Sequence, residues 1–407
     1  MLLVYNFGIL LFGVIIRIFA LFNPKARRWV VGRKGQQKNI QEHVAGVEPI
    51  VWVHCASLGE FEQGRPLIDE IKLKYPQKKI LLTFFSPSGY DVRKDYKNAD
   101  YVYYLPLDTF RNAKRFINSV NPEIVFFIKY EYWYNLLRIL NRKNIPVYFV
   151  SAIFRPDQLF FKSYGKWYRK LLRMATHFFI QNELSASLLD SIHISNYTIT
   201  GDTRFDRVAH VAENVKSLPV VESFVENYPI IVAGSTWKAE EALLKQYIRV
   251  NPTVKIILVP HELENGSVDR IMQQYGDLSI KYSLANQQNV IGKRVLVVDC
   301  YGILTSLYQY GKIAVVGGGF GVGIHNVLEA ATFGMPIVFG PNYEKFNEAV
   351  DLVNQNSAFA VNNIEEFNTV LNHLLKHDDI AQKIGKLTEA YVQNNIGATK
   401  QILDSVF

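Results

Sequence analysis

The sequence has little cysteine: Cys55 and Cys300 are the only two among 407 residues. Two isolated cysteines provide neither a disulfide framework nor a CxxC metal pair, so a reducing compartment fits best. Low-complexity tracts and repeats of fixed period are absent as well, which excludes a disordered chain and a solenoid. The chain is too long for one compact core and 49% of its residues are hydrophobic, so we expect ordered domains, two in number.

Acidic residues are missing from the N-terminal part, where none precedes Glu42. Residues 2–22 are almost continuously apolar, interrupted by Asn6 and Arg17. As a helix this stretch would be about 31 Å long, near the hydrocarbon thickness of a bilayer, and Arg17 could extend its guanidinium to the interface. The basic residues behind it are Lys25, Arg27, Arg28, Arg33, Lys34 and Lys38. This pattern predicts a single N-terminal membrane anchor with the remaining chain in the cytoplasm.

Two other readings of this segment remain open. A cleaved signal peptide carries its positive charge before the apolar run and a small-residue cleavage site after it, and the reverse arrangement here favours an anchor. An interfacial helix that lies on the membrane is the other, because Asn6 and Arg17 weaken a full span. The net charge of +8 is explained by this membrane flank, so we expect no nucleic-acid partner.

Short apolar runs alternate with helix-length segments from residue 50 onward, which is the pattern of βαβ units and a parallel sheet. The predicted strands are 50–54, 80–85, 101–105, 124–128, 147–150, 178–180 and 197–200, then 230–233, 255–259, 295–298, 313–316, 336–339 and 359–361. The predicted helices are 60–75, 108–119, 131–143, 238–250, 267–275, 326–333 and 346–354. We therefore expect an α/β protein with two Rossmann-like, doubly wound domains.

The domain boundaries follow from composition. Residues 205–229 are polar, strand-poor and carry two prolines, which is typical of an interdomain linker. We expect an anchor over 1–24, an N-terminal domain over 25–210 and a C-terminal domain over 211–407. The last helices, 365–376 and 379–394, cover the second sheet or cross back to the first domain. Two such domains facing a cleft bind ligands outside the carboxyl ends of their strands.

A glycine-rich loop follows the predicted strand that ends at Val316, and a helix is expected from Asn326. Such a loop before a helix N-terminus forms a phosphate site in principle. His325 and Glu329 would share a face of that helix, and the Glu329 carboxylate could accept hydrogen bonds from both hydroxyls of a ribose. The alternative is a tight turn with a capping histidine. The GxGxG spacing from Gly319 differs from the dinucleotide fingerprint.

Three more polar loops follow strands of the same half. Ser235 and Thr236 stand before a helix, as phosphate-contacting hydroxyls or as ordinary N-caps. Pro260-His261 follows the next strand, and 299–304, with Gly302, follows another. Four polar loops at four strand exits predict a ligand site more strongly than any one alone.

Two glutamates and one arginine are the candidate chemical groups of the first half. Glu60 follows the first apolar strand and could act as general base toward a sugar hydroxyl, or could only stabilise a helix dipole. Glu131 also follows an apolar strand. Arg204, at the last strand exit before the linker, could face a phosphate or carboxylate, or form a structural ion pair.

Eight segments of the chain, in their order and spacing, match the motifs of one known protein family. They are HCASLGE at 54–60, SPSG at 86–89, LPLD at 105–108, EYWYN at 131–135, TGDTRFD at 200–206, GSTWKAEE at 234–241, GGGFGVGIHNVLE at 317–329 and FGPNYEKF at 339–346. With them the whole chain, anchor included, resembles the Kdo transferases, which add 3-deoxy-D-manno-octulosonic acid (Kdo) to lipid A precursors at the bacterial inner membrane.

The resemblance implies a GT-B glycosyltransferase whose donor is CMP-Kdo and whose acceptor is the lipid A precursor lipid IVA. It implies that Glu60 is the catalytic base and that Glu131 and Arg204 stabilise the transition state. The segments implied to hold CMP comprise Pro260, His261, Tyr301, Gly302, Ile303, Asn326, Val327, Leu328 and Glu329; Ser235, Thr236, Gly318, Gly319 and His325 complete the predicted donor site.

Several positions depart from the family pattern. The family often has arginine in place of His261, glutamate in place of Ile303 and histidine in place of Trp237. Arg204 stands where lysine is usual, and Lys129 and Tyr134 replace an acidic residue and a proline. These departures leave the fold and donor class intact and predict that CMP is held differently from the family's commoner pattern.

The implied reaction is a direct displacement with inversion. Glu60 takes a proton from the lipid hydroxyl, whose oxygen attacks the anomeric carbon of Kdo while CMP leaves. No Asp-x-Asp pair is present, so we expect no metal and no cofactor. Two rivals remain: a GT-B enzyme that uses a UDP-sugar on a lipid acceptor, and a non-catalytic, membrane-bound nucleotide sensor.

Overall fold

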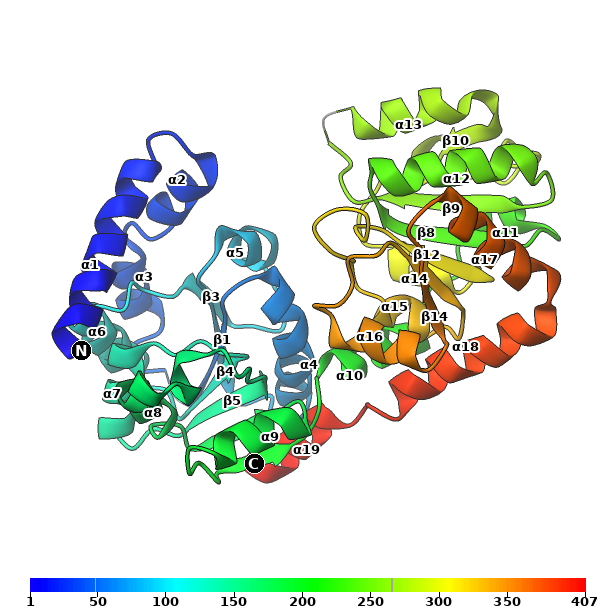
Figure 1. Ribbon diagram of the computed structural model, residues 1–407. Coiled ribbons are helices and arrows are strands. Elements are labelled where there is room, and N and C mark those ends of the chain that lie inside the picture. Colours follow the sequence, from blue (N-terminus) through cyan, green and yellow to red (C-terminus); the bar gives the residue numbers. More distant parts are fainter. Residues whose placement is uncertain (48, 265) are drawn as a thin grey trace. The chain divides into compact units, whose positions relative to one another are not determined.

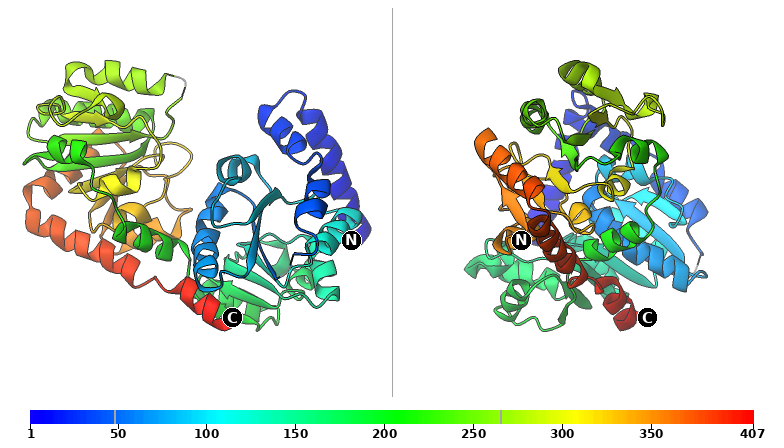
Figure 2. Two further views of the ribbon diagram at one scale, coloured as in Figure 1. Left: turned by 180° about the vertical axis from the view of Figure 1, so that it is seen from behind. Right: turned by 90° about the vertical axis from the view of Figure 1, so that its right-hand side faces the viewer.

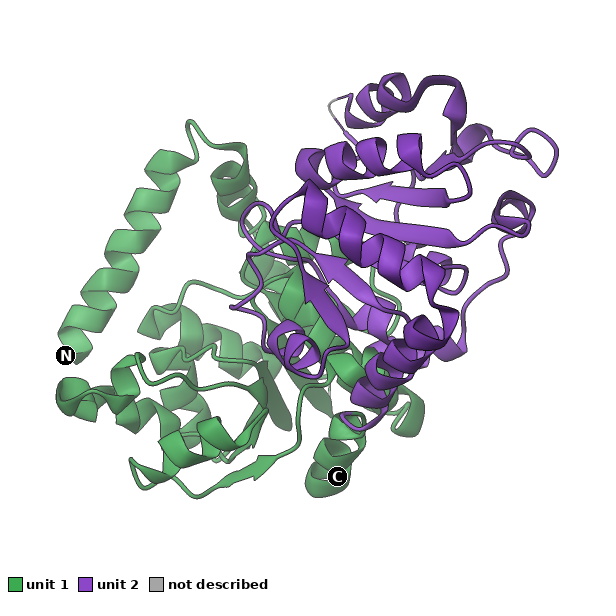
Figure 3. Ribbon diagram, turned by 45° about the vertical axis from the view of Figure 1, so that its right-hand side comes forward, with its two compact units in different colours: residues 1–207, 396–407 green, residues 208–395 purple. Residues whose placement is uncertain are grey.

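The computed structural model describes residues 1–47, 49–264 and 266–407. The chain forms two compact units, coloured separately in Figure 3. The first comprises Met1–Arg207 together with Ile396–Phe407, and the second comprises Val208–Asn395.

The first unit is built on a parallel sheet that has seven strands within the described residues, in the order β3-β2-β1-β4-β5-β6-β7. The strands are β1 Ile50–Cys55, β2 Lys79–Phe84, β3 Tyr101–Tyr104, β4 Ile124–Ile128, β5 Val147–Ala152, β6 His177–Ile180 and β7 Tyr197–Ile199. β1 and β4 are buried at every position. Such strands read as continuous apolar runs because helices cover both faces of the sheet.

Helices cover both faces of this sheet, as Figure 1 shows. They are α1 Leu2–Phe19, α2 Pro24–Val31, α3 Gln36–His43, α4 Leu58–Lys74, α5 Pro87–Arg93, α6 Phe110–Val120, α7 Tyr134–Arg142, α8 Lys166–Leu172, α9 Glu183–Asp190 and α19 Ala398–Val406. α10, Arg204–Glu213, begins in this unit. On one face α4 packs with the C-terminal α19, whose Ile402 and Leu403 join the core under the sheet (Figure 2). The chain therefore completes its first unit with its last helix.

The second unit repeats this architecture, with seven parallel strands among the described residues in the order β10-β11-β9-β8-β12-β13-β14. The strands are β8 Ile230–Thr236, β9 Lys255–Pro260, β10 Ser279–Lys281, β11 Val295–Val297, β12 Ile313–Val316, β13 Ile337–Phe339 and β14 Ala358–Ala360. The helices are α11 Pro219–Val225, α12 Lys238–Val250, α13 Ser267–Tyr275, α14 Leu304–Tyr308, α15 Leu328–Ala331, α16 Asn347–Asn354, α17 Ile364–Lys376 and α18 Asp378–Gln393. The predicted α/β class with two doubly wound sheets is confirmed.

Three local predictions need correction. The boundary between the units, Arg207 to Val208, falls within the stretch 205–229 that was expected to be a linker, but this stretch is helical and contains most of α10 and all of α11. Glu131 lies in a loop, because α7 begins only at Tyr134. The helix expected from Asn326 is a single turn over Leu328–Ala331: the Asn326 carboxamide oxygen accepts from the Leu328 N–H at 3.1 Å, and an asparagine that bonds its own backbone favours a turn.

The N-terminal helix α1 packs along the first unit at several points of its length. Near its start the Tyr5 hydroxyl donates to Asp108 Oδ2 at 2.5 Å, and Asn135 Nδ2 donates to Asn6 Oδ1 at 2.9 Å. At mid-helix a Cβ on Gly13 would lie 2.8 Å from Leu107. The opposite face leaves apolar side chains exposed, among them Leu3, Phe7, Leu10, Val14 and Ile18. α1 is the one helix among the described residues that is long and apolar enough to cross a membrane.

Candidate functional site

Both sheets have a topological switch point, where consecutive connections run in opposite directions. In the first unit this point lies between β1 and β4, and in the second between β8 and β12. Ligands of doubly wound sheets bind there, outside the carboxyl ends of the strands. The predicted residues follow these strands: Glu60 after β1, Glu131 after β4, Ser235 at the end of β8 and the glycine-rich loop after β12. The tertiary fold therefore collects them in two places.

Glu60 lies in the first turn of α4, just past the end of β1. Its Oε2 accepts from the Ser57 N–H at 3.1 Å, so it does cap its own helix. The side chain is 9% exposed. Burial, followed by the charge of Glu131, raises the pKa of Glu60 to about 7, against the smaller opposing effect of Lys129. A carboxylate with this pKa is matched to accept a proton near neutral pH, so the capping role and a general-base role coexist.

Glu131 is held in the loop after β4 by two aromatic side chains. Trp133 Nε1 donates to its Oε2 at 2.9 Å, and His54 Nε2 lies 3.6 Å from the same oxygen. The His54 ring is fully buried, and its Nδ1 lies 2.9 Å from Thr83 Oγ1. Lys129, which precedes this loop, has the unusual backbone angle φ of 64°. The structure thus places the carboxylates of Glu60 and Glu131 and the lysine Lys129 after neighbouring strands, at the carboxyl edge of the first sheet.

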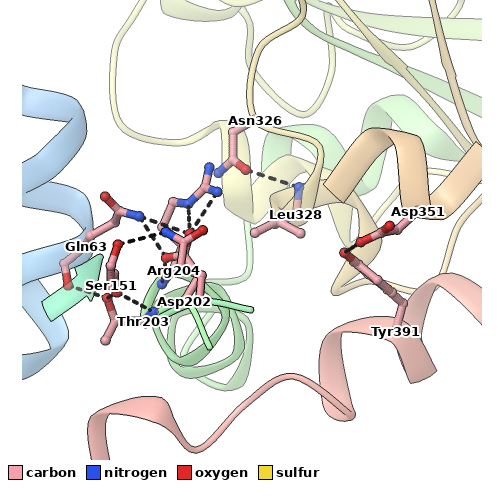
Figure 4. A network of polar contacts seen from close by, with 10 residues as sticks. Gln63, Ser151, Asp202, Thr203, Arg204, Asn326, Leu328, Asp351 and Tyr391 are labelled. Carbon is pink, nitrogen blue, oxygen red and sulfur yellow. Dashed lines mark hydrogen bonds and ion pairs between the residues drawn. The ribbon is translucent and has the colours of Figure 1, made fainter. Parts of the chain in front are cut away.

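Arg204 belongs to a polar network of the first unit, drawn in Figure 4. Its Nε and backbone N–H donate to Asp202 at 2.9 Å each, and Gln63 Nε2 contacts both Asp202 oxygens at 2.9 Å. Gln63 lies three positions after Glu60 on α4, so the two share a helix face. Thr203 Oγ1 donates to the Gln63 backbone oxygen at 2.6 Å. Arg204 is therefore held by Asp202, which is bound to Gln63, and Gln63 lies one helical turn from the predicted base Glu60.

The glycine-rich loop of the second unit is folded upon itself. The Gly321 and Gly323 N–H groups donate to Gly318 O at 2.9 and 3.2 Å. The Gly318 N–H donates to Glu240 Oε1 at 2.9 Å, while the other Glu240 oxygen accepts from the Trp237 N–H and caps α12. These N–H groups serve the loop itself. Its glycines are needed for close backbone approach, because a Cβ on Gly319 would lie 2.5 Å from Gly340 N.

Three aromatic rings stack beside this loop. His261 lies 4.2 Å from the His325 ring and 4.8 Å from that of Trp237, centroid to centroid, and Trp237 Nε1 donates to His325 Nε2 at 2.9 Å. Burial, followed by the nearby His261, lowers the pKa of His325 to about 4. His325 is therefore neutral near pH 7, and because its Nε2 accepts, its Nδ1 carries the proton.

The remaining predicted donor residues form a second cluster. Asn326 Nδ2 donates to Glu329 Oε1 at 3.1 Å, and Thr305 Oγ1 donates to Glu329 Oε2 at 2.8 Å. Thr305 stands in α14, directly after the predicted segment Tyr301, Gly302 and Ile303. Tyr301 is 69% exposed. His325 and Glu329 were expected to share a helix face. They do not, because His325 precedes the helix, which begins at Leu328.

A cavity of about 760 Å³ lies at the strand exits of the second unit. Its lining includes the predicted Thr236, Pro260 and Gly318, together with Trp237, Phe320 and Arg270. Arg270 pairs with Glu241 at 2.6 Å. Ligand pockets are typically about 300–1,000 Å³, so this cavity has the size of a small-molecule site.

Sequence reasoning missed several residues of these clusters. His54 stood within a quoted motif without a role, and Gln63, Asp202 and Glu240 were not singled out. Gln63 and Asp202 are 139 positions apart, so no local pattern links them. For Glu240 a weaker signal existed, because a glutamate in the first turn of a helix can accept from the N-cap N–H, as it does from Trp237.

Comparisons with known proteins agree with this architecture. The family model for the 3-deoxy-D-manno-octulosonic-acid transferases (kdotransferases) matches residues 27–207. A 3-deoxy-D-manno-octulosonic acid transferase from Aquifex aeolicus is 29% identical over 87% of this chain and 94% of its own length. One from Haemophilus influenzae is 27% identical over 87% of this chain and 86% of its own.

Among solved structures, the UDP-GlcNAc 2-epimerase from Neisseria meningitidis superposes with a TM-score of 0.63, covering 88% of this chain and 99% of its own at 16% identity. At this identity the likeness concerns the fold alone, which is of the GT-B type. The family model over residues 27–207 and the two relatives over 87% of the chain agree, and the chain is similar to the 3-deoxy-D-manno-octulosonic acid (Kdo) transferases.

Proposed function

We propose that this protein transfers Kdo from CMP-Kdo to a hydroxyl of a lipid A precursor, lipid IVA, with inversion and release of CMP. The observation that carries the proposal is the buried Glu60 carboxylate, whose pKa is raised to about 7 at the switch point of the first sheet. Similarity to the Kdo transferases supports Kdo as the sugar, because each alignment covers most of this chain and most of the relative.

In this mechanism Glu60 acts as the general base. It takes the proton of the acceptor hydroxyl, whose oxygen forms the new bond to the anomeric carbon of Kdo. The bond from that carbon to the phosphate oxygen breaks, and CMP leaves with the electron pair from the opposite face, which inverts the configuration. Glu131 keeps the pKa of Glu60 high, and a base with a pKa near the working pH is the most effective one.

The leaving phosphate needs positive or hydrogen-bonding surroundings. Lys129 and Arg204 are the cationic side chains of the first unit that fit this role. The predicted helix N-terminus at Asn326 is not available for it, because α15 is a single turn. In the second unit the protonated Nδ1 of His325 offers a neutral donor. We place CMP at the exits of β8, β9 and β12 and at the Asn326–Glu329 cluster, whose carboxylate suits a ribose hydroxyl.

The experiment that tests this function is mass spectrometry of the purified protein with CMP-Kdo and a lipid A precursor. We expect a product heavier by whole Kdo residues, unchanged in the presence of a chelator because the proposed site needs no metal. Binding competition separates the rivals: CMP competes and UDP does not. A product formed only from a UDP-sugar, or nucleotide binding without turnover, would contradict the proposal.

We propose further that α1 attaches the enzyme to the lipid surface without crossing it. The hydrogen bonds of Tyr5 and Asn6 and the close contact of Gly13 hold this helix against the folded unit. A span of about 30 Å of hydrocarbon needs about 20 residues free of such polar attachments. The exposed apolar face of α1 and the basic residues behind it suit insertion into one leaflet with anionic headgroups nearby.

This arrangement predicts that both chain ends lie on the same side of the membrane. A protease added to sealed, cytoplasm-side-out vesicles should remove an N-terminal tag as readily as a C-terminal one, and replacing exposed Phe7 and Leu10 by serine should release the protein from vesicles. A tag on Met1 that is protected while the C-terminal tag is cut would show that α1 spans the membrane.

A further inference from the structure

An apolar groove lies beside the candidate carboxylates of the first unit. It has a volume of about 410 Å³ and runs between α1, α2 and the loop from β2 to α5. Its apolar lining includes Phe12, Ile16, Phe19, Ala26, Trp29 and Phe85. Its volume falls within the usual range of ligand pockets, about 300–1,000 Å³.

The groove has a rigid aromatic wall. Phe12, Trp29 and Phe85 contact one another with ring centroids 5.6 to 6.2 Å apart. Behind them the Arg33 guanidinium lies 3.6 Å from the centre of the Trp29 ring and donates to the backbone oxygens of Trp29, Leu105 and Phe85 at 2.7 to 3.1 Å. Three hydrogen bonds to backbone carbonyl oxygens and one cation–π contact therefore hold the aromatic wall in place without a ligand.

The groove is open on the side of α1. Phe12 is 37% exposed, and Phe19 is 61% exposed. Contiguous exposed apolar surface of this kind marks a site for a lipid or another partner, because leaving it in water is unfavourable. Along α1 the groove continues into the apolar face that we assign to the lipid surface, so an acyl chain could enter from the membrane without crossing water.

The wall also contacts the carboxylate loop. Phe85 stacks on Trp133 with centroids 5.0 Å apart, and Trp133 Nε1 donates to Glu131 at 2.9 Å. Two side chains thus separate the groove from the carboxylate that raises the pKa of Glu60. A molecule with its tail in the groove would present its polar head near these carboxylates.

We propose that this groove binds one acyl chain of the lipid acceptor and thereby positions the acceptor hydroxyl for Glu60. The inference rests on the proposed function, and it adds the acyl chain as a recognised part of the substrate. Phe12, Phe85 and Trp29 are positioning residues here, because they contact the tail and not the reacting atoms.

The test is acyl-chain selectivity in the full-length enzyme. The wild type should use an acceptor with long acyl chains at least about tenfold better in kcat/KM than one with the same head and short chains, about 1.4 kcal/mol. Ala26→Trp fills the groove. It should lower kcat/KM for the long-chain acceptor and leave kcat/KM for the short-chain acceptor unchanged, so that the preference disappears. Val31→Trp, at a 54% exposed position of the same helix, is the matched control and should keep it.

A second readout does not depend on turnover. A long-chain acceptor with a photoreactive group at its chain end should label peptides of α1 or α2 in the wild type and lose this labelling in Ala26→Trp. Equal use of both acceptors by the wild type, an unchanged ratio in Ala26→Trp, or labelling elsewhere overturns the groove assignment and leaves the proposed function standing. Failure to transfer Kdo to either acceptor overturns the proposed function, and this inference with it.

Discussion

Replacing Glu60 by glutamine is expected to lower kcat by a factor of about 10²–10⁴ while CMP-Kdo still binds. The amide cannot take the proton of the acceptor hydroxyl, yet its carbonyl oxygen can still accept from the Ser57 N–H and keep the helix cap. Because the folded-state pKa of Glu60 is raised from its ordinary value of 4.5 to about 7, the fold loses stability as the pH rises between these two values, and the loss is complete above about pH 7. Glu60→Gln removes that cost, so the variant should melt no lower than the wild type at pH 8.

The matched control is Glu70→Gln on the same helix, where the carboxylate is half-exposed and pairs with Lys74. Exposed pairs of this kind contribute about 0–1 kcal/mol, so kcat should be unchanged. Steady-state kinetics, calorimetry with CMP and thermal melting of the three proteins measure these effects. Near-full activity of Glu60→Gln would rule out Glu60 as the base.

The pH dependence of the wild type gives the same assignment a second check. Activity should rise with pH through an apparent pKa of about 7 as Glu60 loses its proton. In Glu131→Gln the repulsive charge is gone, so the pKa of Glu60 falls and the rising limb should move to lower pH. If the rising part of the activity–pH profile does not move in Glu131→Gln, then Glu131 does not affect the pKa of the group whose deprotonation activates the enzyme.

Replacing Gly319 by alanine is expected to cause the second large loss, that of donor binding. The new Cβ would lie 2.5 Å from Gly340 N and 2.8 Å from Gly340 Cα, and backbone cannot move aside as a flexible side chain does. Overpacking of this kind costs about 1–3 kcal/mol. The glycine-rich loop would shift away from the exit of β13, and the affinity for CMP should fall about tenfold or more.

Gly321→Ala is the control for this change. Its Cβ would meet only Gly318 O, at the ordinary distance of 3.6 Å, so CMP affinity should stay within about threefold of the wild type, about 0.6 kcal/mol. Calorimetric titration with CMP and thermal melting of both variants separate loss of the site from loss of the fold. Wild-type affinity in a folded Gly319→Ala would place CMP away from this loop.

Much of the fold was predictable because it is local in the sequence. Buried parallel strands need continuous apolar runs, and the runs around 50–54 and 124–128 are β1 and β4. Ligands of such sheets bind at strand exits near the switch point, and there Glu60 follows β1 and Thr236 ends β8. The boundaries were less predictable. Asn326 turns the backbone with its own carboxamide, and Glu131 precedes its helix by three residues.

What the sequence by itself determined was the class of fold, the similarity to the Kdo transferases and the position of the candidate base after a strand, since these depend on periodic burial and on motifs of contiguous residues. Only the tertiary structure decided how these groups act. The pKa of Glu60 depends on burial and on Glu131. Arg204 is anchored to Asp202, which contacts Gln63, a residue 139 positions before Asp202. The helix α1 is held by Asp108, which lies 103 positions after Tyr5. Such contacts arise when distant segments pack together, and electrostatic effects depend on distance and solvent exclusion, not on separation along the chain.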